Sequence, residues 1–213
     1  MNMRPLNKIL AGAILITCCW MNLANATLIN RGNGMIYDSV QNITWLQNAN
    51  LSGTKMNWED SLAWADSLSV GSFDDWRLSN RDPVCGLAVY NCTVNELGHL
   101  FYNEFGLTQG QGVSSLFSGT NANFNLFINV QASVYWSGAE YAPLTASAWY
   151  FNTKTGIQSA GNKQKGLYYG WAVRDGDVVA VPAFRSLAIF GLGLLGLAAC
   201  KRQGRQRAKL GAV

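Results

Sequence analysis

Hydrophobic and polar positions alternate along the middle of the chain in a way that predicts short strands. Residues 28–46 alternate loosely around a Gly32-Asn33-Gly34 turn, and Asn-Gly between two apolar runs is typical of a hairpin, so we expect two short strands here. Further strand-like runs occupy residues 133–137, 148–152 and 168–174. A turn at Lys154-Thr155-Gly156 fits a hairpin, and these runs together predict an antiparallel set.

Two other segments carry apolar side chains at helical spacing. The pattern predicts one helix over residues 58–69, where Asn57 is placed to cap the first turn. It predicts a second helix over residues 94–105, where Thr93 and Glu96 make a capping box. Helices and strands in this order indicate a mixed domain.

The first 26 residues have the three parts of a secretory signal peptide. A positive start precedes an apolar run, and Ala24-Asn25-Ala26 supplies the small residues that signal peptidase needs. The run is shorter than the roughly 20 residues that span a bilayer. We therefore expect the mature chain to begin at Thr27, outside the cytoplasm. Lipidation at Cys18 is the weaker alternative, because Thr17 fits that pattern poorly.

The other end of the chain predicts a membrane anchor. Residues 186–200 form an uncharged run rich in Leu, Gly and Ala, and a basic tail of residues 201–213 follows. Basic residues after an apolar stretch stay on the cytoplasmic side, so the run predicts a short transmembrane helix. It has no polar face, and a domain of this size has little room to bury such a helix all round.

The segment before the anchor, residues 178–185, contains Val181-Pro182-Ala183. With the apolar helix and the Arg cluster, this arrangement resembles a PEP-CTERM sorting signal. The resemblance implies processing by an exosortase-type enzyme at the inner membrane, with the product at the cell surface, in the extracellular matrix or secreted. The usual Val-Pro-Glu-Pro box is Val-Pro-Ala-Phe here, so the box departs from the family pattern.

The distribution of charge excludes one class of partner. The chain has 16 Lys and Arg and 12 Asp and Glu residues, a net charge of +4. Half of the basic residues lie in the two ends, whereas all the acidic residues lie between residues 27 and 184, so the domain itself is acidic. Nucleic-acid binding needs a clustered basic face, which this domain lacks.

Only two of the five cysteines, Cys85 and Cys92, lie in the expected domain. An isolated pair in an exported chain typically forms a disulfide. A metal site would need two more soft ligands, and the domain offers only His99. Asp74, Asp75 and Asp82 lack the ordered spacing of a calcium loop. We therefore expect a disulfide, no metal and no cofactor.

Residues 27–177 carry short motifs whose order resembles the Lcl C-terminal domain family (domain of unknown function 1566). These motifs are Trp58-Glu59-Asp60, Asp75-Trp76-Arg77-Leu78, Asn95-Glu96-Leu97, Tyr135-Trp136-Ser137, Ala148-Trp149-Tyr150 and Ala172-Val173-Arg174. Two of the motifs depart from the family pattern: Ser79-Asn80 replaces Pro-Thr, and Gly138 replaces a second Ser. The resemblance implies an α+β, C-type-lectin-like fold, with two helices packed on short antiparallel sheets. One member, the end domain of a collagen-like adhesin, is implicated in glycosaminoglycan binding.

Most residues of these motifs are expected to support the fold. Trp76 sits between a charged turn and Leu78, which favours a core position. The planar fork of Arg77 suits pairing with Asp75, Glu96 or Glu104. Trp136 and Trp149 are expected to stabilise paired strands, although an aromatic face also suits a sugar ring.

A stretch rich in Gly, Asn, Ser and Gln, residues 107–131, predicts a long loop of the kind that often carries function. We expect binding to use amides and exposed aromatics of this loop and the nearby strands, namely Asn121, Asn123, Asn125, Tyr141 and Trp149. No catalytic residue is predicted, because His99 is alone on a helix. The sequence favours a non-catalytic surface or matrix module for polysaccharide or another envelope component. The alternatives are an exported enzyme on a lectin-like scaffold and a structural or assembly protein of the envelope.

Overall fold

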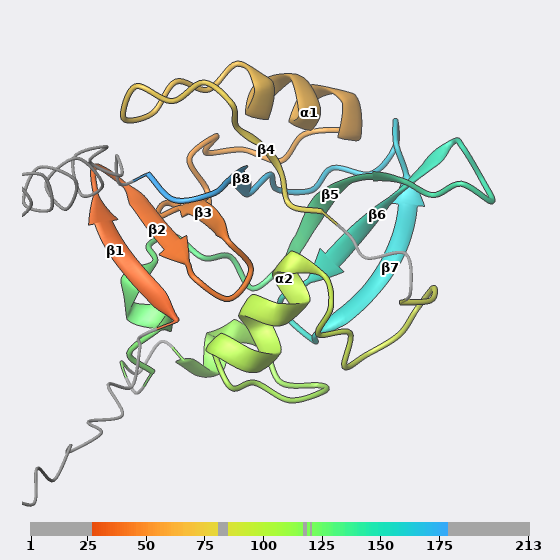
Figure 1. Ribbon diagram of the computed structural model, residues 1–213. Helices are drawn as coiled ribbons and strands as arrows, with labels where there is room; N and C mark the ends of the chain where they lie inside the picture. Colours follow the sequence, from red (N-terminus) through yellow and green to blue (C-terminus); the bar gives the residue numbers. More distant parts are fainter. Residues whose placement is uncertain (1–26, 81–84, 117–118, 120, 179–213) are drawn as a thin grey trace, which may run out of the picture.

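Two antiparallel sheets and two short helices make up the part of the chain that the structure describes (Figure 1). This computed structural model describes residues 27–178 except 81–84, 117–118 and 120. The expected signal peptide, sorting box, anchor and basic tail lie outside the described residues. The coarse expectation of a small α+β domain with antiparallel sheets is confirmed.

The first sheet opens with three strands rather than the expected two. They are β1 (Leu28–Gly32), β2 (Met35–Asp38) and β3 (Ile43–Leu46). Two tight turns separate them, in which Asn33 and Asn42 adopt φ angles of 51° and 53°. Asparagine tolerates this left-handed conformation better than most residues, so each turn reverses the chain within a few residues.

The same sheet is completed by distant parts of the chain. Strand β8 (Ala172–Asp175) lies between β3 and β4 (Arg77–Leu78), giving the order β1-β2-β3-β8-β4. Residues 168–174 were expected to be strand, but the strand begins only at Ala172 and joins the first sheet, not the set formed by the other late strands. Figure 1 shows β8 returning beside the N-terminal strands.

The second sheet has three strands in sequence order. They are β5 (Val134–Glu140), β6 (Ser147–Asn152) and β7 (Ile157–Asn162). The first two match the expected runs, and the expected turn at Lys154-Thr155-Gly156 joins β6 to β7. Gly156 has a φ of 81°, and a Cβ there would lie 2.4 Å from the Tyr102 hydroxyl, so the turn requires glycine.

Helix α1 (Trp58–Asp66) is capped as expected, because the Asn57 side chain accepts from the amide of Asp60 at 2.9 Å. It ends three residues earlier than the pattern predicts.

Helix α2 (Glu96–His99) continues into the π-helical turn η1 (Leu100–Glu104). The expected capping box at Thr93 is wrong: Asn95 caps α2 through the amide of Gly98. The Glu96 side chain is instead turned toward Arg77.

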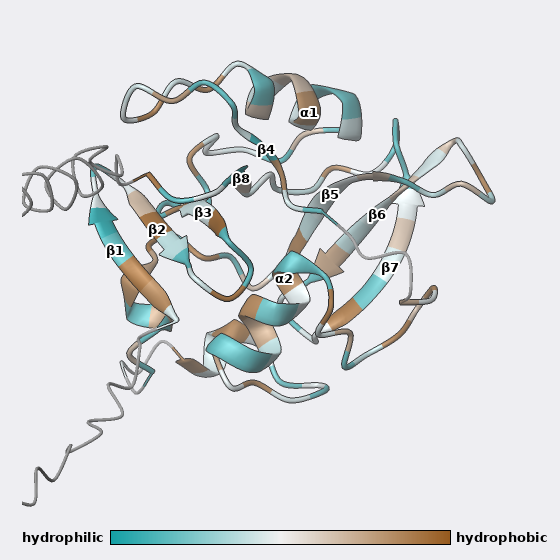
Figure 2. Cartoon of the chain, in the orientation of Figure 1, coloured by the Kyte–Doolittle hydropathy of each residue, from teal (hydrophilic) through white to brown (hydrophobic). Residues whose placement is uncertain are grey.

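The core lies where the two sheets and the helices meet, and it is rich in aromatic rings. Trp45, Trp136 and Trp171 are fully buried. The rings of Trp45 and Trp171 meet edge to face with centroids 5.2 Å apart, a favourable geometry for aromatic pairs. Figure 2 shows hydrophobic segments along β2 and β6 and hydrophilic segments on α1 and α2. The expected long loop contains two 3₁₀ turns, η2 (Val113–Leu116) and η3 (Phe124–Leu126).

Within the described ranges, none of the helices has the length and apolar character needed to cross a membrane. The segment expected to do so, residues 186–200, is not among them.

Candidate ligand-binding cleft

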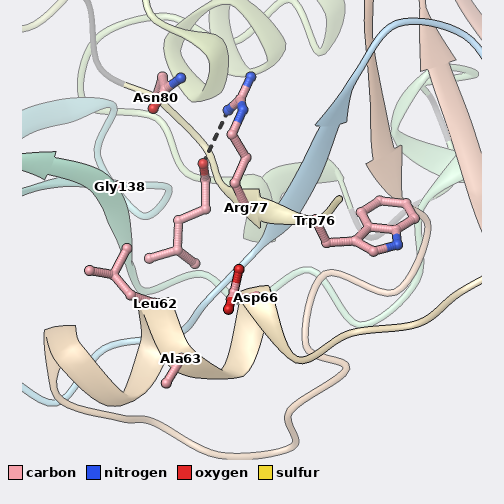
Figure 3. Close-up of a pocket in the computed structure, with 8 residues that line it drawn as sticks. Leu62, Ala63, Asp66, Trp76, Arg77, Asn80 and Gly138 are labelled. Carbon is pink, nitrogen blue, oxygen red and sulfur yellow. Dashed lines mark hydrogen bonds between the residues drawn. The ribbon is translucent and has the colours of Figure 1, made fainter. Parts of the chain in front are cut away.

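An open cleft of about 420 Å³ lies between α1, β4 and β5 (Figure 3). It is lined by Leu62, Ala63, Asp66, Trp76, Arg77, Leu78, Asn80 and Gly138. One wall is apolar and the rim is polar, which is the usual composition of a small-ligand site. Sequence reasoning did not select this cleft, because its residues come from three segments that only the fold brings together.

Helix α1 supplies the wall of the cleft. Leu62 and Asp66 are one helical turn apart and therefore project from the same face, with Ala63 beside them. Leu62 is half-buried against the core, whereas Asp66 is exposed. Helix α1 thus offers apolar surface and a carboxylate to the same space.

Arg77 lines the opposite side, but its charge is already neutralised. Its guanidinium donates to both oxygens of Glu96 at 3.0 and 2.7 Å, and to Asp175 at 2.5 Å. It also donates to the backbone oxygen of Leu78 at 3.1 Å, the bond drawn in Figure 3. Burial lowers the pKa of Arg77, but the bonds and charges of the two carboxylates outweigh that effect and raise it overall. Arg77 therefore keeps its positive charge, but two carboxylates already pair with that charge, and the side chain attracts a further anion only weakly.

Two side chains on the rim remain available to a ligand. Neither the Asp66 carboxylate nor the Asn80 amide forms a hydrogen bond with another described side chain or backbone group. Asn80 is held in place through its main chain, whose amide donates to Glu96. A carboxylate and an amide can together accept and donate hydrogen bonds, while Leu62 and Leu78 provide apolar contact. This combination suits a neutral polyol better than an anion.

The side chains of the Asp75-Trp76-Arg77 motif are bonded to other parts of the fold. Trp76 is 2% exposed, and its indole N–H donates to the Phe73 carbonyl. Of the partners expected for Arg77, Glu96 is confirmed. Asp75 instead pairs with Arg174 at 2.7 and 2.8 Å, and the hydrogen bond from Arg174 lowers the pKa of Asp75.

Trp136 is fully buried on β5, in register with Tyr150 of β6. Its indole N–H donates to the Met56 carbonyl at 3.0 Å.

Trp149 and Tyr141 lie together on the β5–β6 hairpin. Their rings meet edge to face with centroids 4.9 Å apart, and Trp149 is only 3% exposed. The expectation that Trp149 is an exposed aromatic is therefore wrong, because its side chain is buried and packs against Tyr141. Tyr141 is half-exposed and keeps part of its ring at the surface.

The side-chain amides of the three loop asparagines are hydrogen-bonded within the loop and to the end of η1. Asn121 donates to the Phe105 carbonyl at 2.8 Å and accepts from the amide of Phe124. Asn123 donates to the Glu104 carboxylate at 2.9 Å, and Asn125 donates to the Gly119 carbonyl at 3.2 Å. Three of these four bonds satisfy backbone groups, which is a common use of amide side chains in loops, and the fourth holds the loop to the Glu104 carboxylate.

A second open groove of about 460 Å³ lies in the same loop, lined by Phe124, Phe127, Asn129, Val130, Gln131 and Ala132. Its amide side chains are committed, because Asn129 donates to Asn48 and Gln131 donates to the Asn129 carbonyl. It therefore has fewer unused polar groups than the cleft beside α1.

The disulfide between Cys85 and Cys92 is present, with Cα atoms 5.9 Å apart. A buried amide network attaches it to β7: Asn95 donates to Cys92 Sγ and to Gln158, and Gln158 donates to the Cys85 carbonyl at 3.2 Å. Its sulfurs are oxidised and so are not thiol nucleophiles in this form.

Among the described residues, no group of three or more His, Cys, Asp or Glu side chains is arranged so that it could hold a metal ion. Asp75 is paired with Arg174, and Asp82 lies outside the described residues.

The model of the Lcl C-terminal domain matches residues 34–174, which is most of the described chain. The match begins after β1, runs from β2 to all but the last residue of β8, and includes the whole lining of the cleft. A search of curated proteins found no match.

Proposed function

Because the chain belongs to the Lcl C-terminal domain family, we propose that it is an exported, non-catalytic binding module of the cell surface or extracellular matrix. Its ligand is a polysaccharide or another envelope component, held in the cleft between α1, β4 and β5. The proposal includes a C-type-lectin-like scaffold, cleavage by signal peptidase and sorting by an exosortase-type enzyme through the PEP-CTERM-like tail. In this proposal, residues 186–200 anchor the precursor in the membrane.

The observation that carries the proposal is that polar groups without a described partner and an apolar wall border the same cleft. Asp66 and Asn80 face a space that Leu62 and Leu78 border. Sugar hydroxyls form hydrogen bonds with such groups, and the apolar face of a pyranose packs on aliphatic carbon. The acidic domain and the neutralised Arg77 favour a neutral polysaccharide over a sulfated one.

The two departures from the family motifs support the same location. Asn80 and Gly138 both line the cleft. A Cβ added at Gly138 would meet the Leu78 carbonyl oxygen at 3.4 Å and Asn80 Oδ1 at 3.5 Å, which is ordinary contact. A serine would therefore fit there, and glycine leaves the cleft wider by that side chain. Such differences are expected where members of one fold family recognise different ligands.

The alternative of an exported enzyme on a lectin-like scaffold, as in relatives of the formylglycine-generating enzymes, has less support. That chemistry needs reactive cysteines or a metal, and Cys85 and Cys92 form a disulfide. The alternative of a structural or assembly protein differs in needing no ligand, so binding measurements separate it from the proposal.

The test is binding of the mature chain to a glycan array and to the exopolysaccharide of the producing cell. Asp66→Ala and Asn80→Ala should each weaken binding by about tenfold, the effect of losing one or two hydrogen bonds. Gly138→Ser should change the preferred glycan while the thermal midpoint stays within a few degrees. Asp74→Ala is the matched control, since it removes the same charge from an exposed position outside the cleft.

Asn125→Ala tests the loop as an alternative site. If it weakens binding and the cleft variants do not, the location is wrong although the function stands. An absence of binding to any glycan by the folded wild-type chain refutes the function itself.

A further inference from the structure

A buried acidic cluster lies beside Thr27, outside the cleft. Glu104 and His99 are 7% and 8% exposed, and their side chains lie 3.3 Å apart. The Glu104 carboxylate accepts from the hydroxyl of Thr27 and from the Asn123 amide. Asp38 from β2 completes the cluster, because its charge interacts with both His99 and Glu104.

This cluster has more negative charge than the described groups compensate. Asp38 is fully buried, and burial raises its pKa. Its Oδ1 accepts from the amides of Val40 and Gln41, but its Oδ2 is buried and accepts nothing from the described residues. Among the described residues, His99 is the one basic group whose charge is found to act on Asp38. Two buried carboxylates close together are costly, so a further positive charge beside them would stabilise the fold.

Thr27 is fixed firmly against the cluster. Its carbonyl accepts from the backbone amide of Ser39 at 2.8 Å and from the Ser39 hydroxyl at 3.1 Å, while its hydroxyl bonds to Glu104. The backbone nitrogen of a threonine is three bonds from its Oγ1, so the two atoms are less than about 4 Å apart in every rotamer. The nitrogen of Thr27 therefore lies within roughly 6 Å of a Glu104 oxygen, the range in which an opposite charge matters.

We propose that cleavage after Ala26 creates an α-ammonium group on Thr27 that pairs with Glu104 and completes this cluster, so that processing stabilises the mature fold. The ligand of the cluster is thus the chain's own new N-terminus. In the precursor the same nitrogen is an uncharged amide, and the cluster lacks its cation. This inference rests on the signal-peptide cleavage included in the proposed function, but not on any glycan.

The pH dependence follows from the sign of the charge. An α-amino group has an ordinary pKa of about 7.7–8.0, and pairing with Glu104 raises that pKa in the folded state. The stabilisation is therefore fully present below pH about 7.5 and is lost as the pH rises through the higher folded pKa.

The experiment compares two chains ending at Val213 in mild detergent. One begins at Thr27, released from a fusion by a protease that leaves no extra residue, and the other has a single added Ala before Thr27. Both have the same net charge, but the second has its ammonium displaced by one residue. At pH 6.5 the unfolding equilibrium constant should be at least about tenfold smaller for the Thr27 chain, as for a charge-assisted hydrogen bond. The difference should vanish at pH 9.5 and in a Glu104→Gln background.

Equal stability of the two chains at pH 6.5, or a difference that survives Glu104→Gln, overturns the inference. If Glu104→Gln fails to fold, the pKa of the Thr27 α-amine, measured by NMR after selective ¹³C methylation, decides: a raised pKa supports the pairing and an ordinary one refutes it. Mass spectrometry of protein from the producing cell checks the premise separately. A natural N-terminus other than Thr27 would show that cleavage does not occur after Ala26. The engineered chains test only the pairing of the Thr27 ammonium group with Glu104.

Discussion

The disulfide between Cys85 and Cys92 closes a short loop that is also held by other bonds, so the effect of removing it can be calculated. Val89 in this loop exchanges two backbone hydrogen bonds with Gln158 of β7, at 3.0 and 2.8 Å. These bonds do not depend on the sulfurs. Reduction should therefore leave the folded loop in place and act mainly on the unfolded chain.

The magnitude follows from the length of the closed loop. A separation of 7 residues corresponds to a loop-closure entropy that stabilises the fold by about 2 kcal/mol at 25 °C. For a domain of this size that is a fall in the thermal midpoint of about 5–10 °C. The loss should not approach the whole stability of the domain, because the Gln158 network also anchors the loop.

The assay is urea unfolding of the mature chain with and without reductant, followed by tryptophan fluorescence. Cys200→Ser is present throughout so that the tail thiol takes no part. Cys85→Ala/Cys92→Ala should match the reduced protein and unfold at lower urea, with a slightly larger slope because its unfolded state is less compact. Unchanged midpoints on reduction would refute the entropic argument. Loss of native fluorescence without urea would show that the bond maintains the folded loop itself.

Three further changes are expected to have measurable effects. Trp136→Phe leaves a cavity and removes one of the two hydrogen bonds to the Met56 carbonyl, which keeps the bond from the Tyr168 amide. It should therefore destabilise the chain by about 2–4 kcal/mol in urea unfolding, mainly through the cavity. Glu96→Gln weakens the bidentate clamp on the guanidinium and should cost about 1–3 kcal/mol, measured by calorimetry with Glu59→Gln as the exposed control. Because its bond to Arg174 lowers the pKa of Asp75, that carboxylate stabilises the fold above its ordinary pKa and the contribution is lost as pH falls further. The urea midpoint of Asp75→Asn should therefore fall less than that of the wild-type chain between about pH 4 and 2. An equal fall in both chains would contradict this reasoning.

Local patterns in the sequence predicted most of the helices and strands. The predictions failed where a residue distant in sequence but close in space binds the side chain concerned. The Asn57 cap and the β6–β7 turn depend on residues close in sequence and were predicted. The cap of α2 was assigned to Thr93 and Glu96. The sequence offered Glu96 both for this cap and as one of three partners of Arg77, and only the fold shows that the Glu96 carboxylate binds Arg77 of β4.

The candidate cleft shows the same limit. Asp66 was not singled out in the sequence, and Asn80 was recognised only as a departure from a motif. A signal for the cleft was present in the two unusual positions, Asn80 and Gly138, but they are far apart in sequence. Trp149 was assigned to the surface because aromatic residues on a strand can face either side, and the packing of the hairpin decides which.

Sequence alone determined the membership in a family, the class of fold, the oxidised cysteine pair and the acidic character of the domain, because each depends on residue types, their order or their near neighbours. Tertiary structure decided which carboxylate neutralises Arg77, which polar groups remain unused at the cleft and which acidic residues gather beside Thr27. These outcomes depend on contacts between residues tens of positions apart, whose energies depend on distance and burial and so exist only after the chain has folded.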